Sequence, residues 1–308
     1  MMRIAIVGAG GIGGYYGGLL ARAGNEVALI ARGAHLEAIR TAGLQVESVH
    51  GDFTVRPALA TSDPAEVGPV DLILFTVKTY DLEEAGRAAA PLLGPDTVVL
   101  PLENGLEAPG MLGQLLGAER VLPGVTYVSA SIAAPGRIRQ VSELRRIVFG
   151  EADGGSTPRA ERIREVLAAS GIEVVLTGDI QAALWTKFIF MATAAGVCAA
   201  ARLPLSAALA CPETRALFQQ ALQEAAAVAR AEGVALPADI AERTMRTGEG
   251  FPPGTRPSML VDLEAGRRLE LEAMSGAVVR RGEAGGVATP VHRVLYALLK
   301  PWAGGAAA

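Results

Sequence analysis

The chain is poor in cysteine and histidine, the residues from which disulfide frameworks and most zinc sites are built. It has two cysteines, Cys198 and Cys211, and 3 histidines among 308 residues. Two cysteines are too few for a disulfide framework or a zinc cluster. We therefore expect no metal site, and a protein of the reduced cytoplasm.

Excess basic charge and long apolar runs are also absent. With 28 basic and 32 acidic residues the formal net charge is −4, which gives no support for binding nucleic acid or an anionic membrane. No uninterrupted apolar stretch reaches the roughly 18 residues of a membrane-spanning helix, and the N-terminus has no signal-peptide cleavage pattern. Because half of the residues are hydrophobic, we expect a soluble, cytoplasmic protein with an ample core.

Short apolar runs alternate with helix-like stretches from Arg3 to about Gly178. Most of these runs are apolar at nearly every position, as in strands that helices cover on both faces. The alternation is typical of an α/β fold with a Rossmann-type, doubly wound and mainly parallel sheet. The expected strands are RIAIVG, EVALIA, DLILFTV, TVVLPL, RRIVFG and IEVVLT.

Two further segments predict strand pairs joined by turns. The stretch GLQVESVHGDFTVRPALAT (43–61) predicts a small hairpin inserted after the second helix. The stretch VTYVSASIAAPGRIRQV (125–141) predicts two strands joined by a Pro-Gly turn, at the far end of the sheet.

From about Ile180 the strand signals stop and alanine-rich amphipathic stretches take over. Examples are ETRALFQQALQEAAAVARAEG and SMLVDLEAGRRLELEAMSGAVVRRGEAGG. We expect a Rossmann-type domain over 1–178 and an all-helical domain over 179–308. Apolar stripes at helical spacing fit either a plain core or the seam of a homodimer, and the sequence leaves both open.

A glycine-rich turn lies between the first strand and the first helix. Gly8, Gly10 and Gly13 form G-x-G-x-x-G. The first glycine permits a tight turn, the second lets a pyrophosphate approach the backbone, and the third lets helix and strand pack closely. The amide groups at the start of the helix then face the phosphates. In this strand–turn–helix context the motif predicts a dinucleotide site.

Arg32 indicates which dinucleotide binds. An NAD-preferring fold usually ends its second strand with an acidic residue that binds the ribose hydroxyls. Here the chain reads LIARGAHL, with Arg32 in that place. A guanidinium suits a 2′-phosphate, so we expect NADPH; the alternative is an ordinary solvated arginine.

Polar residues follow two more expected strands. Lys78 comes just after DLILFTV, and Asn104 just after TVVLPL. Ligands of open α/β sheets bind outside the carboxyl ends of the strands, so both should border the cofactor crevice. The alternatives are a solvated loop lysine and, for Asn104-Gly105, a turn or helix cap. We interpret Glu103 as a surface charge.

A carbonyl reductase needs a proton donor, and the helical half offers few. Lys187 is the one lysine of the apolar helix ALWTKFIFMATAAGV, where desolvation would lower its pKa and make it a competent acid; the alternative is a lysine that snorkels to water. Ser258 fits a helix N-cap, and Glu270 fits a surface ion pair with Arg267. No role is assigned to the histidines, which we expect in loops or on a helix surface: His35, His50 and His292.

Taken together these motifs resemble the ketopantoate reductase (2-dehydropantoate 2-reductase) family. The likeness spans Met2 to about Lys300 and includes the glycine motif, Arg32, VKTYD, ENG, LWTK and SMLVDLEAGRRLELE. It implies NADPH-dependent reduction of 2-dehydropantoate to pantoate, on the route to pantothenate and coenzyme A.

The resemblance also implies roles for individual residues. Lys187 would be the proton donor, with Asn104 and Glu270 as the other catalytic groups. The implied substrate-binding residues are Asn104, Lys187, Met191 and Ser258. The implied cofactor-binding residues are Gly8, Ala9, Gly10, Gly11, Ile12, Gly13, Arg32, Lys78, Asn104, Ala130 and Glu270.

One departure from the family pattern concerns the substrate. Four and eight positions after the lysine the family usually has asparagines, and this chain has Met191 and Ala195. Each lost amide would weaken the binding of a hydroxyl-rich substrate by about 1–3 kcal/mol. Alternatives are therefore a reductase of a less polar 2-keto acid, a 3-hydroxyacid-type dehydrogenase, and a non-catalytic NADP sensor.

Overall fold

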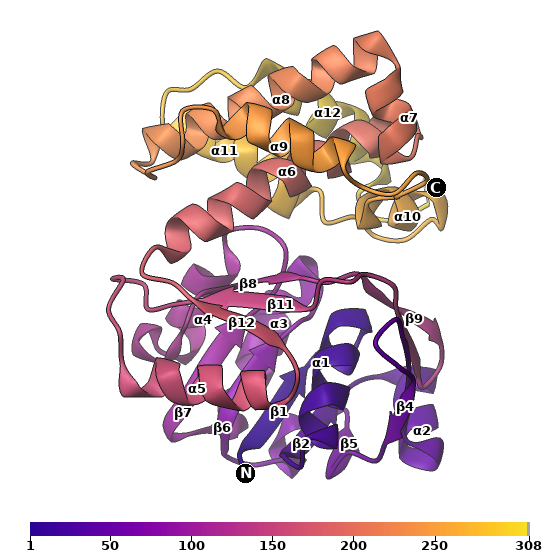
Figure 1. The fold of residues 1–308 in the computed structure, drawn as a ribbon, viewed down its shortest axis with the longest axis vertical. Coiled ribbons are helices and arrows are strands. Elements are labelled where there is room, and N and C mark those ends of the chain that lie inside the picture. Colours follow the sequence, from indigo (N-terminus) through magenta and orange to yellow (C-terminus); the bar gives the residue numbers. More distant parts are fainter. Residues whose placement is uncertain (307–308) are drawn as a thin grey trace. The chain divides into compact units, whose positions relative to one another are not determined.

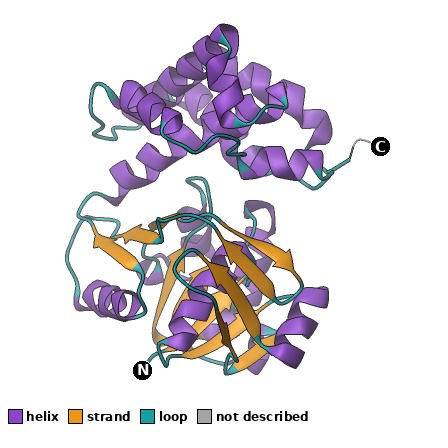
Figure 2. Ribbon diagram, turned by 45° about the vertical axis from the view of Figure 1, so that its right-hand side comes forward, coloured by secondary structure: helices purple, strands orange, loops and turns teal. Residues whose placement is uncertain are grey.

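The structure, a computed structural model, describes residues 1–306, which form two compact units. Unit 1 consists of Met1–Glu103 and Glu107–Ile180. Unit 2 consists of Asn104–Leu106 together with the chain from Gln181 onward. Figure 1 labels the elements of both, and Figure 2 shows that the strands of the described chain belong to unit 1, whereas unit 2 is helical.

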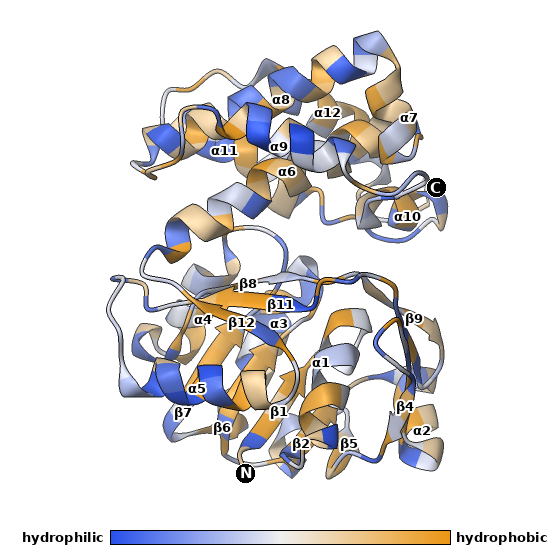
Figure 3. Cartoon of the chain, viewed as in Figure 1, coloured by the Kyte–Doolittle hydropathy of each residue, from blue (hydrophilic) through white to orange (hydrophobic). Residues whose placement is uncertain are grey.

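Unit 1 is built on a five-stranded parallel sheet with the strand order β5-β2-β1-β6-β7. Its strands are β1 (Arg3–Val7), β2 (Glu26–Ile30), β5 (Leu59–Thr61), β6 (Val70–Phe75) and β7 (Leu93–Pro101). Ile4 and Ile6 of β1 enter one hydrophobic core, while Ala5 and Val7 enter another. Because successive side chains of a strand point to opposite faces, the sheet is buried on both sides, and β1 and β6 are mostly hydrophobic in Figure 3. The predicted α/β, doubly wound fold is confirmed.

Helices cover both faces of this sheet. Leu19 of α1 and Leu167 of α5 belong to the first core, whereas Leu82 of α3 and Leu112 of α4 belong to the second. The helices of unit 1 are α1 (Gly11–Arg22), α2 (Gly33–Ala42), α3 (Leu82–Ala88), α4 (Ala108–Leu116) and α5 (Pro158–Ala169).

The remaining strands form two smaller sheets. One has the order β4-β3-β10-β9 and contains β3 (Leu44–Ser48), β4 (Phe53–Val55), β9 (Ala130–Ala134) and β10 (Arg137–Gln140). The other has the order β12-β11-β8 and contains β8 (Gly124–Tyr127), β11 (Arg146–Phe149) and β12 (Glu173–Leu176). Both expected hairpins exist, but the position of the second at the far end of the parallel sheet is wrong. Strand β10 pairs with β3 instead, so the two hairpins share one sheet.

Helix α1 accounts for the many glycines after the motif, because it packs against two sheets. A Cβ atom at Gly17 would lie 2.7 Å from Leu29 of the parallel sheet, and one at Gly18 would lie 3.3 Å from Val46 of the four-stranded sheet. A Cβ at Gly14 would lie 2.8 Å from Ile138 of that second sheet. Small residues on two sides of one helix therefore let both sheets approach its backbone.

Unit 2 has its own hydrophobic core, around α6 and α8. Its helices are α6 (Ile180–Ala201), α7 (Leu205–Ala210), α8 (Pro212–Ala231), α9 (Ile240–Glu249), α10 (Ser258–Glu264), α11 (Ala277–Ala284) and α12 (Pro290–Leu299). By length and composition α6 is apolar enough to cross a membrane, but 67% of its most apolar window is buried inside the protein. Core helices pass the same test, and α6 is one.

The helical stretch expected over 258–286 is interrupted. Helix α10 ends at Glu264, Gly266 has a φ of +63°, and helical structure resumes with a π-helical turn at Glu272–Gly276. A glycine with positive φ commonly ends a helix. Glu270 thus lies in the non-helical segment between α10 and α11.

Candidate active site

The glycine turn of unit 1 has the conformation that its spacing predicts. Gly8 has a φ of +92°, which a residue with a side chain rarely adopts. A Cβ at Gly13 would overlap the side-chain oxygen of Thr76 and the carbonyl oxygen of Gly8, so the start of α1 packs directly on the turn. Around Gly10, in contrast, a Cβ would have open space, with nothing nearer than 4.0 Å.

This open space lies where a phosphate could bind. The amide of Gly14 donates to the carbonyl oxygen of Gly10 at 2.7 Å. The amides of residues 11–13 precede it in the first turn of α1, where a helix offers no backbone acceptor. Open room beside Gly10 and a row of such amides fit the pyrophosphate of a dinucleotide.

Three other cofactor candidates belong to unit 1, and one of them contacts this turn. The backbone of Ala130 lies so close to Gly11 that a Cβ there would overlap the Ala130 carbonyl oxygen. Lys78 is half-buried three residues after the end of β6, and Arg32 is the N-cap residue of α2. The side chain of Arg32 is 68% exposed and donates to Glu84 of α3 at 2.9 Å. Arg32 is therefore solvent-accessible, with a neighbouring carboxylate that neutralises part of its charge.

In unit 2, Lys187 and Asn104 meet. The Lys187 Nζ donates to Asn104 Oδ1 at 2.9 Å, although the two residues are 83 positions apart. Burial lowers the pKa of Lys187 to about 8, and the negative charge of Glu270 opposes that shift. An ammonium group with this pKa is still mainly protonated at pH 7 and can release its proton readily. The side chain hydrogen-bonds inside unit 2, so the alternative of a lysine that snorkels to water does not describe it.

Glu270 is buried, at 7% exposure, and the interpretation of it as a surface ion pair with Arg267 is wrong. Arg267 instead donates to Asp262 at 2.8 Å. The physical reason is the break after α10, because residues 267 and 270 do not share a helix there.

The other substrate-side residues differ in exposure. Ser258 is exposed and is the first residue of α10, whose N-cap is Pro257, so its interpretation as the N-cap is wrong. On α6, Met191 is half-buried and Ala195 is buried. The helix positions four and eight residues after Lys187 are therefore apolar.

Two expectations about exposure need correction. Glu103 is only 8% exposed and so is no surface charge; it lies two residues after the end of β7, next to the buried Leu102. His292 is wholly buried in α12 and so lies neither in a loop nor on a helix surface, whereas His35 is half-buried on α2. The amphipathic spacing of apolar residues does not predict the burial of single polar residues such as these. Thr76, which donates to the Gly8 carbonyl oxygen at 2.7 Å, was also missed.

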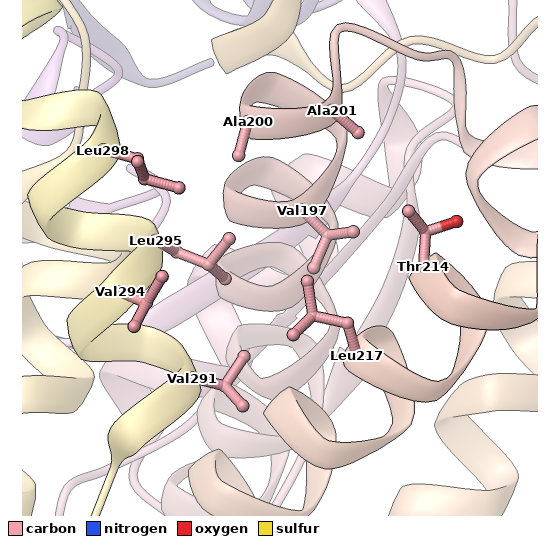
Figure 4. A pocket seen from close by; sticks show the side chains of 9 residues that line it. All are labelled: Val197, Ala200, Ala201, Thr214, Leu217, Val291, Val294, Leu295 and Leu298. Atoms are coloured by element: carbon pink, nitrogen blue, oxygen red, sulfur yellow. The ribbon is translucent and has the colours of Figure 1, made fainter.

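An apolar pocket of unit 2 is separate from these residues. It has a volume of about 240 Å³ and is lined by side chains of α6, α8 and α12, as Figure 4 shows. Its only polar lining residue is Thr214, and it contains none of the candidate site residues. A pocket without convergent polar groups gives an acid substrate no orientation.

Comparison with known proteins gives one consistent result. Residues 4–154 match the family model "Ketopantoate reductase PanE/ApbA", and residues 179–303 match its C-terminal counterpart. A 2-dehydropantoate 2-reductase of Caulobacter vibrioides is 34% identical, over 97% of this chain and 98% of that protein. The crystal structure of a PanE/ApbA family ketopantoate reductase from Ralstonia eutropha JMP134 is 37% identical, with a TM-score of 0.91 and 98% of each chain covered. The ternary structure of D-mandelate dehydrogenase with NADH and anilino(oxo)acetate is 27% identical, with a TM-score of 0.89 and 98% of each chain covered.

Proposed function

The chain belongs to the ketopantoate reductase family, a family of oxidoreductases, and from this membership we propose that it reduces 2-dehydropantoate to pantoate with NADPH. The observation that carries the proposal is the hydrogen bond from Lys187 to Asn104, beside the buried Glu270. A carbonyl that accepts a hydride develops negative charge on its oxygen. An ammonium group that is ready to release its proton stabilises that charge.

Four residues are assigned tasks in this reaction. Lys187 gives the proton at Nζ to the keto oxygen. Asn104 accepts a hydrogen bond from Nζ through Oδ1, which holds the ammonium in one direction, and its amide protons can bind the keto oxygen or the substrate carboxylate. Glu270 keeps Lys187 protonated by electrostatic attraction. The hydroxyl group of Ser258 forms a hydrogen bond with the substrate.

The cofactor assignment rests on unit 1. NADPH, when bound, supplies the hydride. The amides of residues 11–13 and the open space at Gly10 would hold its pyrophosphate. Arg32 would bind the 2′-phosphate, and Lys78 and Ala130 would line the nicotinamide side. We assign cofactor binding to residues 1–178 and substrate binding to residues 179–308, in a cytoplasmic enzyme of pantothenate and coenzyme A biosynthesis.

A less polar 2-keto acid is the second candidate substrate. It is favoured by the apolar side chains of Met191 and Ala195 on the face of α6 that carries Lys187. The D-mandelate dehydrogenase with a similar fold, crystallised with anilino(oxo)acetate, is consistent with an apolar pocket in such proteins.

A substrate panel followed by NADPH absorbance tests the reaction. The panel contains 2-dehydropantoate, branched and aromatic 2-keto acids, and 3-hydroxyacids with NADP in the reverse direction. Turnover of 2-dehydropantoate with the highest kcat/KM supports the first candidate, and a preference for an aromatic keto acid supports the second. Preference for a 3-hydroxyacid contradicts both.

Lys187→Ala separates an enzyme from a sensor. Loss of the proton donor should lower kcat about 100- to 10,000-fold while NADPH binding persists. The matched control is Lys300→Ala, since Lys300 is an exposed lysine of the same unit that pairs with Glu272. Equal turnover in the two variants would contradict the assigned role of Lys187.

A further inference from the structure

His35 joins three segments of unit 1 that are distant in sequence. It lies in the first turn of α2. Its Nε2 lies 3.0 Å from the carbonyl oxygen of Ala9 in the glycine turn. Its Nδ1 accepts a hydrogen bond of 3.0 Å from the amide of Gly136, in the turn between β9 and β10. One imidazole ring thus bridges the glycine turn and the hairpin.

These two partners determine the protonation state of the ring. A backbone amide can only donate and a carbonyl can only accept. Nδ1 must therefore carry a lone pair, and Nε2 must carry the proton that it donates to Ala9. Only the neutral Nε2–H tautomer satisfies both partners, because a second proton on Nδ1 would face the amide proton of Gly136.

The hairpin that His35 holds lies against the start of α1. A Cβ at Gly11 would overlap the Ala130 carbonyl oxygen of β9, and a Cβ at Gly136 would lie 2.8 Å from Ala38 of α2. The carbonyl oxygen of Gly136 accepts a hydrogen bond from the amide of Gln45. Both backbone polar groups of Gly136 are therefore bonded, the amide to His35 and the carbonyl to β3. The position of the hairpin therefore affects the space in front of the first amides of α1.

His35 also engages a carbonyl group within the glycine turn itself. The Gly8 carbonyl oxygen accepts from Thr76 at 2.7 Å, and the Ala9 carbonyl oxygen accepts from His35. A carbonyl oxygen without a donor would point its negative end into the surroundings of the anion site. Both carbonyls of this turn are instead held by side chains.

Charged groups on the three segments do not determine the protonation state of the His35 ring. Each is paired elsewhere: Arg32 with Glu84, Arg40 with Glu37, and Arg137 and Arg139 with Glu47. Burial lowers the pKa of His35, and the hydrogen bond to Ala9 opposes the shift. The ring is thus neutral at pH 7 and takes up a proton only in acid.

We propose that neutral His35 is a positioning residue that holds the glycine turn and the β9–β10 hairpin in the arrangement that binds the cofactor pyrophosphate, and that its protonation weakens cofactor binding. This inference rests on the proposed cofactor site. Protonation replaces the acceptor for Gly136 by a donor, so the hairpin loses its bond to the ring.

The test uses two variants that each keep one of the two bonds. In His35→Asn the amide oxygen can replace Nδ1 toward Gly136, and in His35→Gln the amide nitrogen can replace Nε2 toward Ala9. The control is His50→Gln, since His50 is an exposed histidine of the same unit. The Kd of NADPH is measured between pH 5.5 and 8.0 for the four proteins.

At pH 8.0 we expect both His35 variants to bind NADPH several-fold more weakly than wild type, and His35→Asn more weakly than His35→Gln. The KM for NADPH should rise accordingly, while kcat stays within about twofold. As the pH falls, wild type and His50→Gln should lose affinity until they bind as weakly as His35→Gln, because the protonated ring, like the glutamine, can donate to Ala9 but offers no acceptor to Gly136. Titration of the 2′-phosphate, which also occurs near pH 6, affects all four proteins and cancels in the ratios.

Two results would overturn the inference alone: ratios of Kd that do not change with pH, or tighter binding in acid only where His35 is present. The second result would make His35 a cationic phosphate ligand. Failure of wild type to bind NADPH or NADH at any pH would instead overturn the proposed function together with the inference. Nitrogen-15 spectra of the free protein give a further check, because a ring of His35 that is not the Nε2–H tautomer at pH 7.5 contradicts the geometry directly.

Discussion

At the residue scale, the proposed reaction depends on the protonation state of Lys187. Because burial lowers the pKa of Lys187 to about 8, this proposed proton donor carries its proton below that pH and loses it above. The rate of keto acid reduction should therefore fall as the pH rises through about 8. Oxidation of the hydroxy acid needs the neutral amine and should rise over the same range.

Glu270→Gln tests the electrostatic part of this arrangement. Glu270 raises the pKa of Lys187 against the effect of burial, so removing its charge should lower that pKa further. We expect the alkaline limb of kcat for reduction to move to lower pH by about one unit. The measurement is the pH profile of kcat at saturating NADPH, with Glu272→Gln as the control, since Glu272 is a carboxylate two positions away that pairs with Lys300 and Arg280. A limb that stays in place in Glu270→Gln contradicts the assignment.

The preference for NADPH over NADH is a second property at this scale, and we expect Glu84 to reduce it. Arg32 donates to Glu84 at 2.9 Å, and both side chains are exposed. A carboxylate beside the guanidinium repels a 2′-phosphate, so Glu84→Gln should lower the Kd of NADPH about two- to fivefold and leave that of NADH unchanged. Arg32→Ala should raise the Kd of NADPH about tenfold. The control Glu83→Gln removes an equally exposed charge that pairs with Arg87 on the same helix. Equal effects on NADPH and NADH would show that Arg32 does not bind the phosphate.

The sequence predicts which residues could carry the chemistry, but it does not predict which residues surround them in the fold. The lone lysine in an apolar helix indicated a shifted pKa, and the structure gives the shift in that direction. The contact with Asn104 spans 83 positions, which no local pattern encodes. Burial of Glu270, Glu103 and His292 was missed for the same reason, because each is buried by segments remote in sequence.

At the scale of elements, two glycines at the start of α1 have different roles, one in the proposed cofactor binding and one in packing. Gly10 has open space where a Cβ would go, whereas a Cβ at Gly13 would overlap Thr76 and Gly8. Gly10→Ala should therefore fold with nearly the stability of wild type and bind NADPH at least tenfold more weakly, because its methyl group would enter the proposed pyrophosphate site. Gly13→Ala should lose stability by about 1–3 kcal/mol.

Urea unfolding and NADPH titration of the two variants together decide the matter. Gly24→Ala is a poor control because Gly24 has a φ of +88°. Gly110→Ala is a suitable one, since it places a methyl group in open space on α4 without a positive φ. Normal NADPH binding by Gly10→Ala would remove the glycine turn from the cofactor site.

Local pattern predicted the strands well but their partners poorly. Runs such as EVALIA and DLILFTV form β2 and β6 of the parallel sheet as expected. Strand β11 instead pairs with β12 on one side and with β8 on the other, so the three strands form a separate sheet. The pairing of β3 with β10 joins Val46 to Ile138, and such non-local registers follow from packing on α1 rather than from the strands themselves.

For the whole molecule, the two units have independent cores and different titrating groups. Unit 2 contains the buried His292, and it also contains both tryptophans of the chain, Trp185 and Trp302. Tryptophan fluorescence therefore reports the unfolding of unit 2. This allows the stability of one unit to be measured in the intact chain, where a single two-state transition is not assured.

His292 should make unit 2 lose stability in mild acid. Burial lowers the pKa of His292 to about 4 from 6.5, and its ring contacts the carbonyl oxygen of Ala221 at 3.1 Å. Between these two pH values the unfolded chain binds a proton that the folded chain does not. Stability is therefore fully present above pH 6.5 and falls as the pH drops toward 4, by about 3 kcal/mol in total.

The variant His292→Gln isolates this effect in urea unfolding followed by tryptophan fluorescence. A glutamine amide can still donate to Ala221 but does not titrate, so the variant should start from a lower free energy of unfolding at pH 7.5 and change less between pH 6.5 and 4. Glu224, whose carboxylate accepts from the amides of Val291 and His292, titrates in both proteins and cancels in the comparison. His50→Gln, an exposed histidine in unit 1, should keep the wild-type slope. If His292→Gln loses as much stability in acid as wild type does, some other group takes up the proton, and the buried ring of α12 is not what makes unit 2 sensitive to acid.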